Sequence, residues 1–295
     1  MVIMHEWQGL TTEQNNINSE KIDEVSTLEM LQIIQSEDKK VAESIEKELK
    51  NISDAIDLIS YSIKNDGRLF YVGAGSSGRL GILDAAECPP TFGISAKIIQ
   101  GIIAGGEKAV FNAVEGAEDN PNGAIKQLQE RRVKPNDVVL GIAASGVTPY
   151  VKGAVEYALS IDCKTIFLTC NNLNSKPNVD IIISPIVGPE VITGSTRLKA
   201  GTATKLVLNM ISTGTMISLG KTYGNLMVDL KPTNAKLVNR SIRIFCSIAK
   251  TTEYEAKSYL KKANNNLKTA LVMKLKNCDK KIATQLLREN ENSIK

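Results

Sequence analysis

Short apolar segments alternate with longer stretches of helical periodicity through the middle of the chain. Strands are predicted over Leu69–Val72, Ala96–Ile99, Val138–Ala143, Thr165–Thr169 and Val179–Ser184. Strands that are apolar throughout and are separated by helices predict a parallel sheet that is covered on both faces. The expected fold class is therefore α/β, a doubly wound, mostly parallel five-stranded sheet in an αβα sandwich.

Polar residues dominate the region before the first predicted strand. Residues 1–20 have no clear period and are expected to form an extended arm. Ser26-Thr-Leu-Glu29 matches a capping box, which predicts a helix through Gln35. Apolar spacing predicts two further helices over residues 38–50 and 52–63, so helices precede the sheet.

The character of the chain changes again towards its end. A long helix is predicted from Thr202 to Gly220, and Lys and Asn become frequent after Pro232. Short helices are expected there, in a small helical C-terminal unit. We divide the chain into an N-terminal arm with helices, a ligand-binding α/β domain, a connector and this helical unit, over residues 1–53, 54–220, 221–238 and 239–295.

Composition narrows the range of partners. The 295 residues are 42% hydrophobic and 23% charged, the balance of an ordinary globular protein. The aromatic share of 4% argues against platforms on which nucleic-acid bases stack. The net charge is +4, and its excess after residue 195 is explained by a solvated surface. No nucleic-acid partner is expected.

Cysteine and histidine usage restricts the chemistry. The five Cys are odd in number and have no CxxC spacing, which argues against a disulfide framework or a zinc site. The first 20 residues are too polar for a signal peptide and no apolar run is long enough for a membrane span, so a reducing cytoplasm is expected. The only histidine is His5, expected to be a solvated terminal residue, so acid–base work falls to Glu, Asp, Lys, Tyr or Cys.

The turn Gly73-Ala-Gly-Ser-Ser-Gly78 follows the first predicted strand and precedes an apolar helix start at Leu80. Backbone N–H groups and hydroxyls of Gly75, Ser76 and Ser77 would face a ligand at the helix N-terminus, where the helix dipole favours a phosphate. The GxGxxG spacing also permits a dinucleotide site, but no acidic residue closes a second strand. A purely structural tight turn is the third reading.

Two later segments are also rich in hydroxyl groups. Ser145, Gly146 and Thr148 follow the third predicted strand, and they are candidates for binding phosphate oxygens or an ordinary helix cap before Pro149. Two such turns at the ligand edge of one parallel sheet favour a shared pocket.

A third segment lies before the long helix. Its candidate ligand-binding residues are Thr193, Ser195, Thr196 and Lys199. Arg197 would add a second positive charge, although both cations would equally suit a solvated loop face.

Three glutamates could carry proton transfer. Glu87 is expected at the end of a helix, followed by Cys88 and two prolines that would form a rigid exit. Glu115 and Glu118 lie in a segment of low helix propensity. Taken alone, a glutamate in such a loop is more often solvated than catalytic.

Together these segments resemble the N-acetylmuramic acid 6-phosphate etherase family. The resemblance rests on residues 73–93, 114–119, 144–150, 188–205 and 224–230 and covers roughly residues 8 to 245. Leu10-Thr-Thr-Glu13 also fits the opening of the family, whereas the following Asn-Asn-Ile-Asn departs from its more usual Arg-Asn-Pro.

The resemblance implies a sugar isomerase (SIS) domain that binds phosphosugars, in homodimers with shared active sites and without a metal or redox cofactor. It implies cleavage of the D-lactyl ether of N-acetylmuramic acid 6-phosphate to N-acetylglucosamine 6-phosphate and D-lactate. By position, Glu87 would be the acid on the lactyl oxygen and Glu118 the base at C2, with the reverse assignment open.

Two alternatives use the same domain. An aldose–ketose isomerase of the SIS type would employ a glutamate after the fifth strand, for which Glu190 is the candidate. A non-catalytic phosphosugar-binding regulator is expected to carry two SIS modules or a DNA-binding helical domain, and neither is evident in this sequence.

Overall fold

The computed structural model describes residues 9–173, 177–230, 232, 234–290 and 293–294, so His5 lies outside the described residues. Contacts along the chain divide it into two units. The first comprises Met1–Ala86 and Lys97–Ser212, and the second comprises Glu87–Ala96 and Thr213–Lys295. The cavity of the candidate site is lined by residues of the first unit, whereas Glu87 belongs to the second.

A parallel sheet with the strand order β2-β1-β3-β4-β5 forms the centre of the first unit. All four of its strand pairs are parallel, with Leu69 opposite both Ile99 and Val138. The strands are β1 (Leu69–Gly73), β2 (Ile99–Ile103), β3 (Val138–Ile142), β4 (Lys164–Leu168) and β5 (Ile181–Ile183). The predicted doubly wound α/β class is confirmed.

The second strand lies further along the chain than predicted. The expected segment Ala96–Ile99 overlaps β2 only at Ile99. A Cβ atom at Gly101 would lie 2.6 Å from the Cα of Ile82, so only glycine lets the preceding helix pack on the strand.

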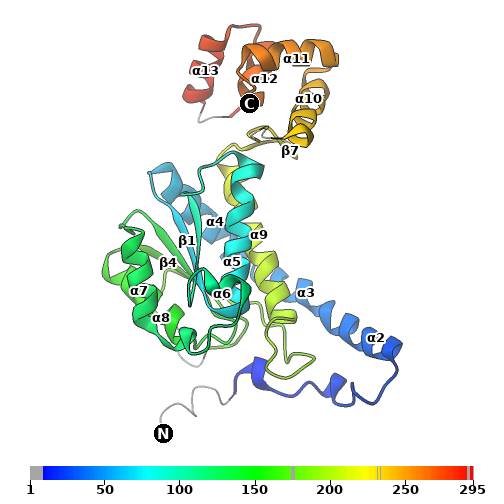
Figure 1. Ribbon diagram of the computed structural model, residues 1–295, viewed down its shortest axis with the longest axis vertical. Coiled ribbons are helices and arrows are strands. Elements are labelled where there is room, and N and C mark those ends of the chain that lie inside the picture. Colours follow the sequence, from blue (N-terminus) through cyan, green and yellow to red (C-terminus); the bar gives the residue numbers. More distant parts are fainter. Residues whose placement is uncertain (1–8, 174–176, 231, 233, 291–292, 295) are drawn as a thin grey trace. The chain divides into compact units, whose positions relative to one another are not determined.

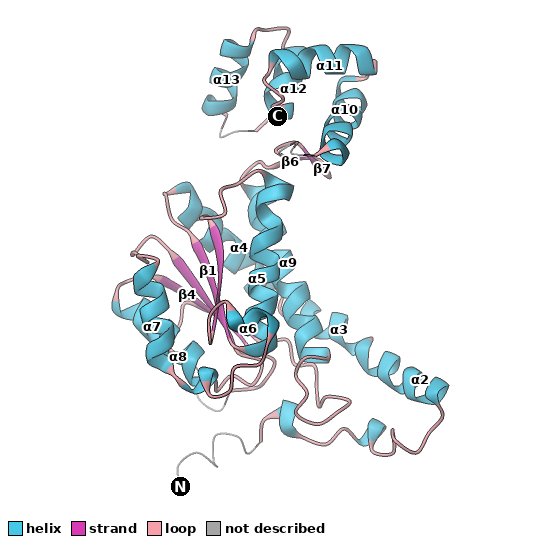
Figure 2. Ribbon diagram, viewed as in Figure 1, coloured by secondary structure: helices cyan, strands magenta, loops and turns pink. Residues whose placement is uncertain are grey.

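Helices cover both faces of the sheet (Figure 1, Figure 2). One face carries α7 (Pro121–Glu130) and α8 (Pro149–Ser160), which pack against Phe70, Val72 and Val139. The opposite face carries α4 (Leu49–Lys64), α5 (Gly75–Phe92) and α9 (Lys199–Ser218). Alternation along β1 explains this arrangement, because neighbouring residues of a strand point to opposite faces.

The helix α5 differs from the prediction at both ends. It begins at Gly75 rather than Leu80, so the glycine- and serine-rich turn is its first turn. It also continues through Pro89 and Pro90 to Phe92, so the expected rigid exit after Glu87 was wrong. The chain leaves the helix at Gly93, whose φ of +68° is the left-handed conformation that ends many helices.

The part of the arm that the structure describes packs against the domain. It holds the short 3-10 helices η1 (Thr11–Glu13) and η2 (Ile17–Ser19), and Thr12 is buried. The helices α2 (Thr27–Asp38) and α3 (Lys40–Glu46) follow, and Ser26 forms the predicted capping box with Glu29. Leu28 and Leu31 on α2 are exposed.

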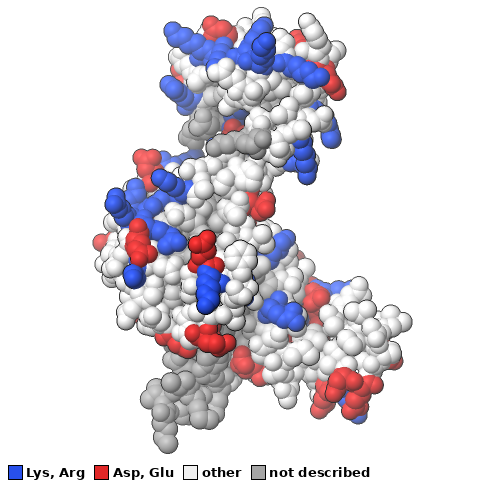
Figure 3. All heavy atoms as spheres, in the orientation of Figure 1, with Lys and Arg blue, Asp and Glu red and all other residues white. Residues whose placement is uncertain are grey.

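The second unit contains a two-stranded antiparallel ribbon and helices. The ribbon is β6 (Thr222–Tyr223) with β7 (Leu226–Met227), and the helices are α10 (Ala235–Ala249), α11 (Glu253–Lys262), α12 (Leu267–Leu275) and α13 (Lys280–Glu289). Phe245, Leu260, Leu271 and Leu287 belong to its core. Basic side chains gather over these helices (Figure 3). Among the described residues, no helix has both the length and the apolar character of a membrane span.

The remaining elements of the first unit are short. The helix α6 (Lys108–Phe111) and the 3-10 helix η3 (Ala117–Asp119) lie between β2 and α7. Gly116 precedes η3 with a φ of +69° and so allows the chain to reverse there. This reversal determines where Glu115 and Glu118 lie.

Candidate active site

The candidate site lies at the carboxyl ends of the strands. β1 and β3 are neighbours at the centre of the sheet, where the strand order reverses, and Gly73 pairs with Ile142 at their ends. In open α/β sheets, ligands bind in the crevice at this point because the loops on its two sides diverge. The β1–α5 and β3–α8 turns, both predicted to bind phosphate, therefore lie at the same edge.

The first turn of α5 offers hydrogen-bond donors to a ligand. The Gly78 amide donates to the Ala74 carbonyl (3.2 Å), so the amides of Gly75, Ser76 and Ser77 have no acceptor within the helix. A Cβ at Gly78 would lie 2.6 Å from Ile103 Cγ1 and 2.8 Å from the Gly73 oxygen. Glycine is thus required for α5 to begin directly on the strand, and the exposed amides and the helix dipole favour an anion there.

A cavity of about 200 Å³ adjoins this turn. Its walls include Gly75, Arg79, Glu115 and Glu118. Arg79 donates from Nε to the Val110 carbonyl (3.0 Å) and from Nη2 to the Asn112 carbonyl (3.1 Å). These bonds fix the α6–η3 segment against α5. The structure thus brings a candidate phosphate-binding turn and two carboxylates into one cavity.

Glu87 does not line this cavity. It lies on α5 three helical turns beyond Ser76, and its side chain is exposed. Glu118 is also exposed, in η3. Within one chain the two predicted acid–base residues are therefore not brought together in this cavity.

The β3–α8 turn has the expected local structure. Thr148 is the N-cap residue of α8 and Pro149 occupies its first turn. Gly146 adopts a φ of +81°, and a Cβ there would lie 2.3 Å from Leu173 Cδ2. The Ser145 hydroxyl accepts a hydrogen bond from the Val147 amide (3.3 Å). Ser145, Gly146 and Thr148 do not line the cavity that holds Glu118, although their turn adjoins the β1–α5 turn across the sheet edge.

The loop between β5 and α9 is held by the arm. The Gly194 amide donates to the Thr12 carbonyl (3.1 Å), and the Thr193 hydroxyl donates to Asn15 Oδ1 (3.2 Å). Ser195 and Thr196 follow within tight turns and are partly exposed. The position of these three hydroxyl residues therefore depends on contacts with the arm, which no local pattern in the sequence predicts.

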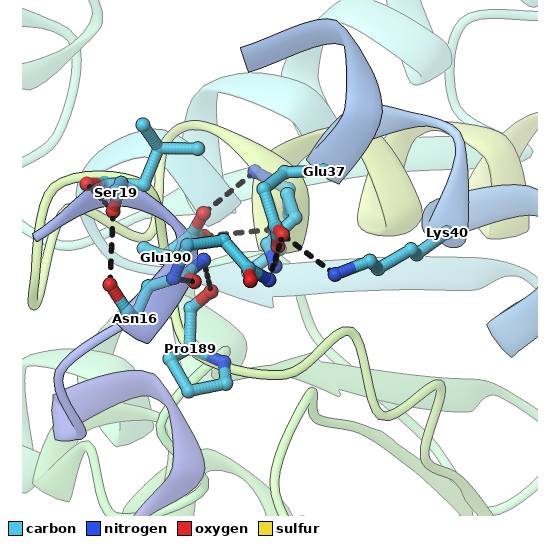
Figure 4. Close-up of polar contacts among 10 residues, drawn as sticks. Asn16, Ser19, Glu37, Lys40, Pro189 and Glu190 are labelled. Atoms are coloured by element: carbon cyan, nitrogen blue, oxygen red, sulfur yellow. Dashed lines mark hydrogen bonds and ion pairs between the residues drawn. The ribbon is translucent and has the colours of Figure 1, made fainter. Parts of the chain in front are cut away.

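Glu37 and Glu190 lie in a cluster of polar contacts (Figure 4), and Lys199 is hydrogen-bonded to both of them. Lys199 Nζ lies 2.6 Å from Glu37 Oε2, and the two side chains are 1% and 2% exposed. The Glu37 carboxylate also accepts hydrogen bonds from Lys40 Nζ (2.6 Å) and Asn18 Nδ2 (2.9 Å). Burial raises the pKa of Glu37, but the hydrogen bonds from Lys199, Lys40 and Asn18 outweigh it and lower that pKa to about 2.

Glu190, the candidate base of the isomerase alternative, caps α9. Its two carboxylate oxygens accept the amides of Lys199 and Ala200, each at 2.9 Å, and the side chain is fully buried. Burial raises its pKa, against the lowering effect of those two amides. Both oxygens are thus engaged with the helix backbone.

Comparisons with known proteins identify the family of the chain. The chain is 52% identical over 288 residues to an N-acetylmuramic acid 6-phosphate etherase from Clostridium beijerinckii, covering 97% of this chain and 95% of the relative. It is 53% identical over 286 residues to the etherase of the same name from Clostridium botulinum strain Okra, with the same coverage of each chain. The chain belongs to the N-acetylmuramic acid 6-phosphate etherase family.

Two more distant likenesses concern the domain itself. The family model for the glucokinase regulatory protein N-terminal SIS domain matches residues 51–159 of this etherase-family chain. A phosphoheptose isomerase structure from Neisseria gonorrhoeae superposes with a TM-score of 0.51 at 20% identity, covering 65% of this chain and all of the isomerase. At that identity the superposition establishes only the shared fold, which is the predicted SIS architecture.

Proposed function

We propose that the chain cleaves the D-lactyl ether bond of N-acetylmuramic acid 6-phosphate and so acts as a carbon–oxygen lyase. The observation that carries this proposal is the cavity in which the first turn of α5 meets Glu115 and Glu118. Identity above 50% along nearly the whole chain to proteins named for this etherase activity supports the same substrate.

The reaction needs two carboxyl groups in opposite protonation states. Opening of the sugar ring places an aldehyde at C1, which acidifies the proton at C2. In our proposal the Glu118 carboxylate removes this proton, the C3–O bond breaks, and Glu87 as a carboxylic acid protonates the departing lactyl oxygen. Water then adds across the C2–C3 double bond, with its hydroxyl on C3 and a proton on C2, to give N-acetylglucosamine 6-phosphate and D-lactate.

The polar turns would bind the rest of the substrate. The amides and hydroxyls of the α5 turn, Gly75, Ser76 and Ser77, suit the phosphate, with Ser145, Gly146 and Thr148 across the sheet edge. Thr193, Ser195 and Thr196 would contact the sugar. Lys199 would act indirectly, since its ammonium group is bound to Glu37.

A homodimer would complete the site. The rise of an α-helix places Glu87 about 18 Å along α5 from Gly75, too far for both to contact one sugar. Leu83, Ala86, Glu87 and Pro90 form an exposed stripe at helical spacing on α5, and Leu83 is 54% exposed. A second copy packed on this stripe would bury its apolar residues and bring Glu87 of one subunit to the cavity of the other.

We place the reaction in the cytoplasm. The five cysteines are free thiols, which suits a reducing compartment. A sugar phosphate carries charge that does not cross a bilayer unaided. Fractionation of cells followed by immunoblotting should find the protein with cytoplasmic markers, and its recovery with a secreted fraction would contradict this location.

The assay is D-lactate release from N-acetylmuramic acid 6-phosphate by the native chain, Glu87→Gln and Glu118→Gln. Loss of general acid–base catalysis should lower the rate about a hundredfold or more in each variant. Glu115→Gln is the matched control in the same cavity wall and should keep most of the activity. Turnover of fructose 6-phosphate without lactate release would instead support the isomerase alternative.

Mixing the two inactive variants tests the shared site. In a symmetric dimer, half of the subunit pairs in an equal mixture are mixed and each has one intact site, so activity should return to about a quarter of the native level. Activity that stays at the level of the separate variants would contradict a site formed across subunits.

A further inference from the structure

A second cavity, of about 380 Å³, shares the residue Arg79 with the cavity of the glutamates. Its walls include Ser76, Arg79, Arg197, Thr202 and Lys205. None of the described residues that line it is acidic. It is formed where the first turn of α9 lies beside the first turn of α5.

Among the described residues, the three cations of this cavity form no ion pair with a carboxylate, and the charge of Lys205 acts on the buried Asp84 only at longer range. No ion pair within the described part of the chain involves Arg197 or Lys205, and both side chains are exposed at the cavity. Arg79 donates two hydrogen bonds to backbone carbonyl groups, which carry no net charge and so leave its positive charge uncompensated. Three positive charges around one hollow favour an anion, and a guanidinium group suits the planar, two-oxygen geometry of a carboxylate.

The proposed substrate carries two anions, a phosphate on C6 and the carboxylate of the lactyl group. The phosphate suits the free amides at the start of α5. The carboxyl carbon lies two bonds from the ether oxygen, so its subsite must adjoin the cavity in which the ether is cleaved. Arg79 lines both cavities and therefore satisfies this requirement.

We infer that the Arg79, Arg197 and Lys205 cavity binds the lactyl carboxylate and makes the site specific for carboxylated ethers of amino-sugar phosphates. This assignment rests on the proposed etherase function. Arg197 and Lys205 are specificity-determining residues in this assignment, and they discriminate the muramic acid derivative from sugar phosphates that lack a carboxylate.

The test compares N-acetylmuramic acid 6-phosphate with an analogue in which a neutral carboxamide replaces the lactyl carboxylate. The analogue keeps the ether and the phosphate. One charged hydrogen bond corresponds to about tenfold or more in affinity, so the native chain should lose at least about tenfold in kcat/KM on the carboxamide. The Lys205→Met and Arg197→Met chains should lose a similar factor in kcat/KM on the carboxylate substrate but little on the carboxamide. Lys205→Arg, which keeps the charge, should retain discrimination, and Lys47→Met on an exposed site elsewhere should match the native chain.

Calorimetric titration with N-acetylglucosamine 6-phosphate separates the two anions. The Lys205→Met and Arg197→Met chains should bind this product as the native chain does. Weaker binding would mean that the cavity holds the phosphate, which overturns the inference. An unchanged ratio of carboxylate to carboxamide turnover in the variants would overturn it while leaving the etherase function intact. Absence of lactate release by the native chain would overturn the proposed function, and the inference with it.

Discussion

Replacement of Glu37 by Gln should destabilise the first unit through Lys199. In the native chain the Lys199 ammonium lies 2.6 Å from Glu37 and is 1% exposed. An amide in place of the carboxylate leaves a buried positive charge without its counter-charge. Breaking a buried ion pair in this way costs about 3–5 kcal/mol, much more than the loss of an exposed pair.

Calorimetry and far-ultraviolet circular dichroism would measure the effect. For a unit of this size about 2–4 °C of melting temperature corresponds to each kcal/mol, so Glu37→Gln should lower the transition by roughly 10 °C. Lys40→Met is the matched control, because Lys40 binds the same carboxylate but is 48% exposed, and it should cost less than about 1 kcal/mol. The double variant Glu37→Gln with Lys199→Met removes both charges and should recover much of the loss.

The pH dependence gives an independent check. Glu37 has a folded pKa of about 2 against its ordinary value of 4.5. A lowered folded pKa contributes stability that is present above pH 4.5 and is lost as the pH falls towards 2, by about 3 kcal/mol in all. The native and Glu37→Gln stabilities should therefore converge in acid. Equal melting of Glu37→Gln and Lys40→Met at neutral pH, or a constant gap down to pH 2, would refute this account.

Three further changes test other parts of the structure. Gly78→Ala should lower the melting temperature and weaken N-acetylglucosamine 6-phosphate binding, because overpacking against β1 and β2 costs about 1–3 kcal/mol. Burial raises the pKa of Asp84 above its ordinary value of 3.8, so the stability of the native chain should fall as the pH rises through that raised pKa. Thermal melts from pH 3 to 7 should show this fall for the native chain but not for Asp84→Asn. Lys268→Met should destabilise the second unit by about 1–3 kcal/mol, because the buried Lys268 pairs with Asp229 (2.5 Å) and Lys221 (3.2 Å) remains as a partner of that carboxylate. Faster limited proteolysis of the second unit would measure this loss.

The order of the elements was predictable because it follows from local pattern. Apolar runs mark four of the five strands within one or two residues, and Ser26 marks the start of α2. The predicted bounds of β2 and α5 were wrong because tertiary packing outweighed a local sequence preference at these places. Gly101 weakens the strand signal but allows close contact with Ile82, and Pro89 remains within α5 although it cannot donate to the helix.

The site was predictable as a set of motifs but not as an arrangement. The turn at Gly75 and the segment at Glu118 share a cavity, as the sheet topology requires. The pairing of Glu37 with Lys199 joins residues far apart in the sequence, and no local pattern distinguishes Glu37 from an exposed helix glutamate. The placement of Lys205 opposite Arg79 likewise depends on how α9 packs beside α5.

The length of α5 is the strongest structural reason to expect a site shared between subunits. Had the helix ended at Glu87, as the prolines suggested, that carboxylate could have turned back on a loop towards the substrate. Because the helix continues to Phe92, Glu87 is held on its exposed side with Leu83 one turn away. A rigid helix cannot return Glu87 to its own first turn, which is the reason for our proposal that the second carboxylate comes to the cavity from another copy of the chain.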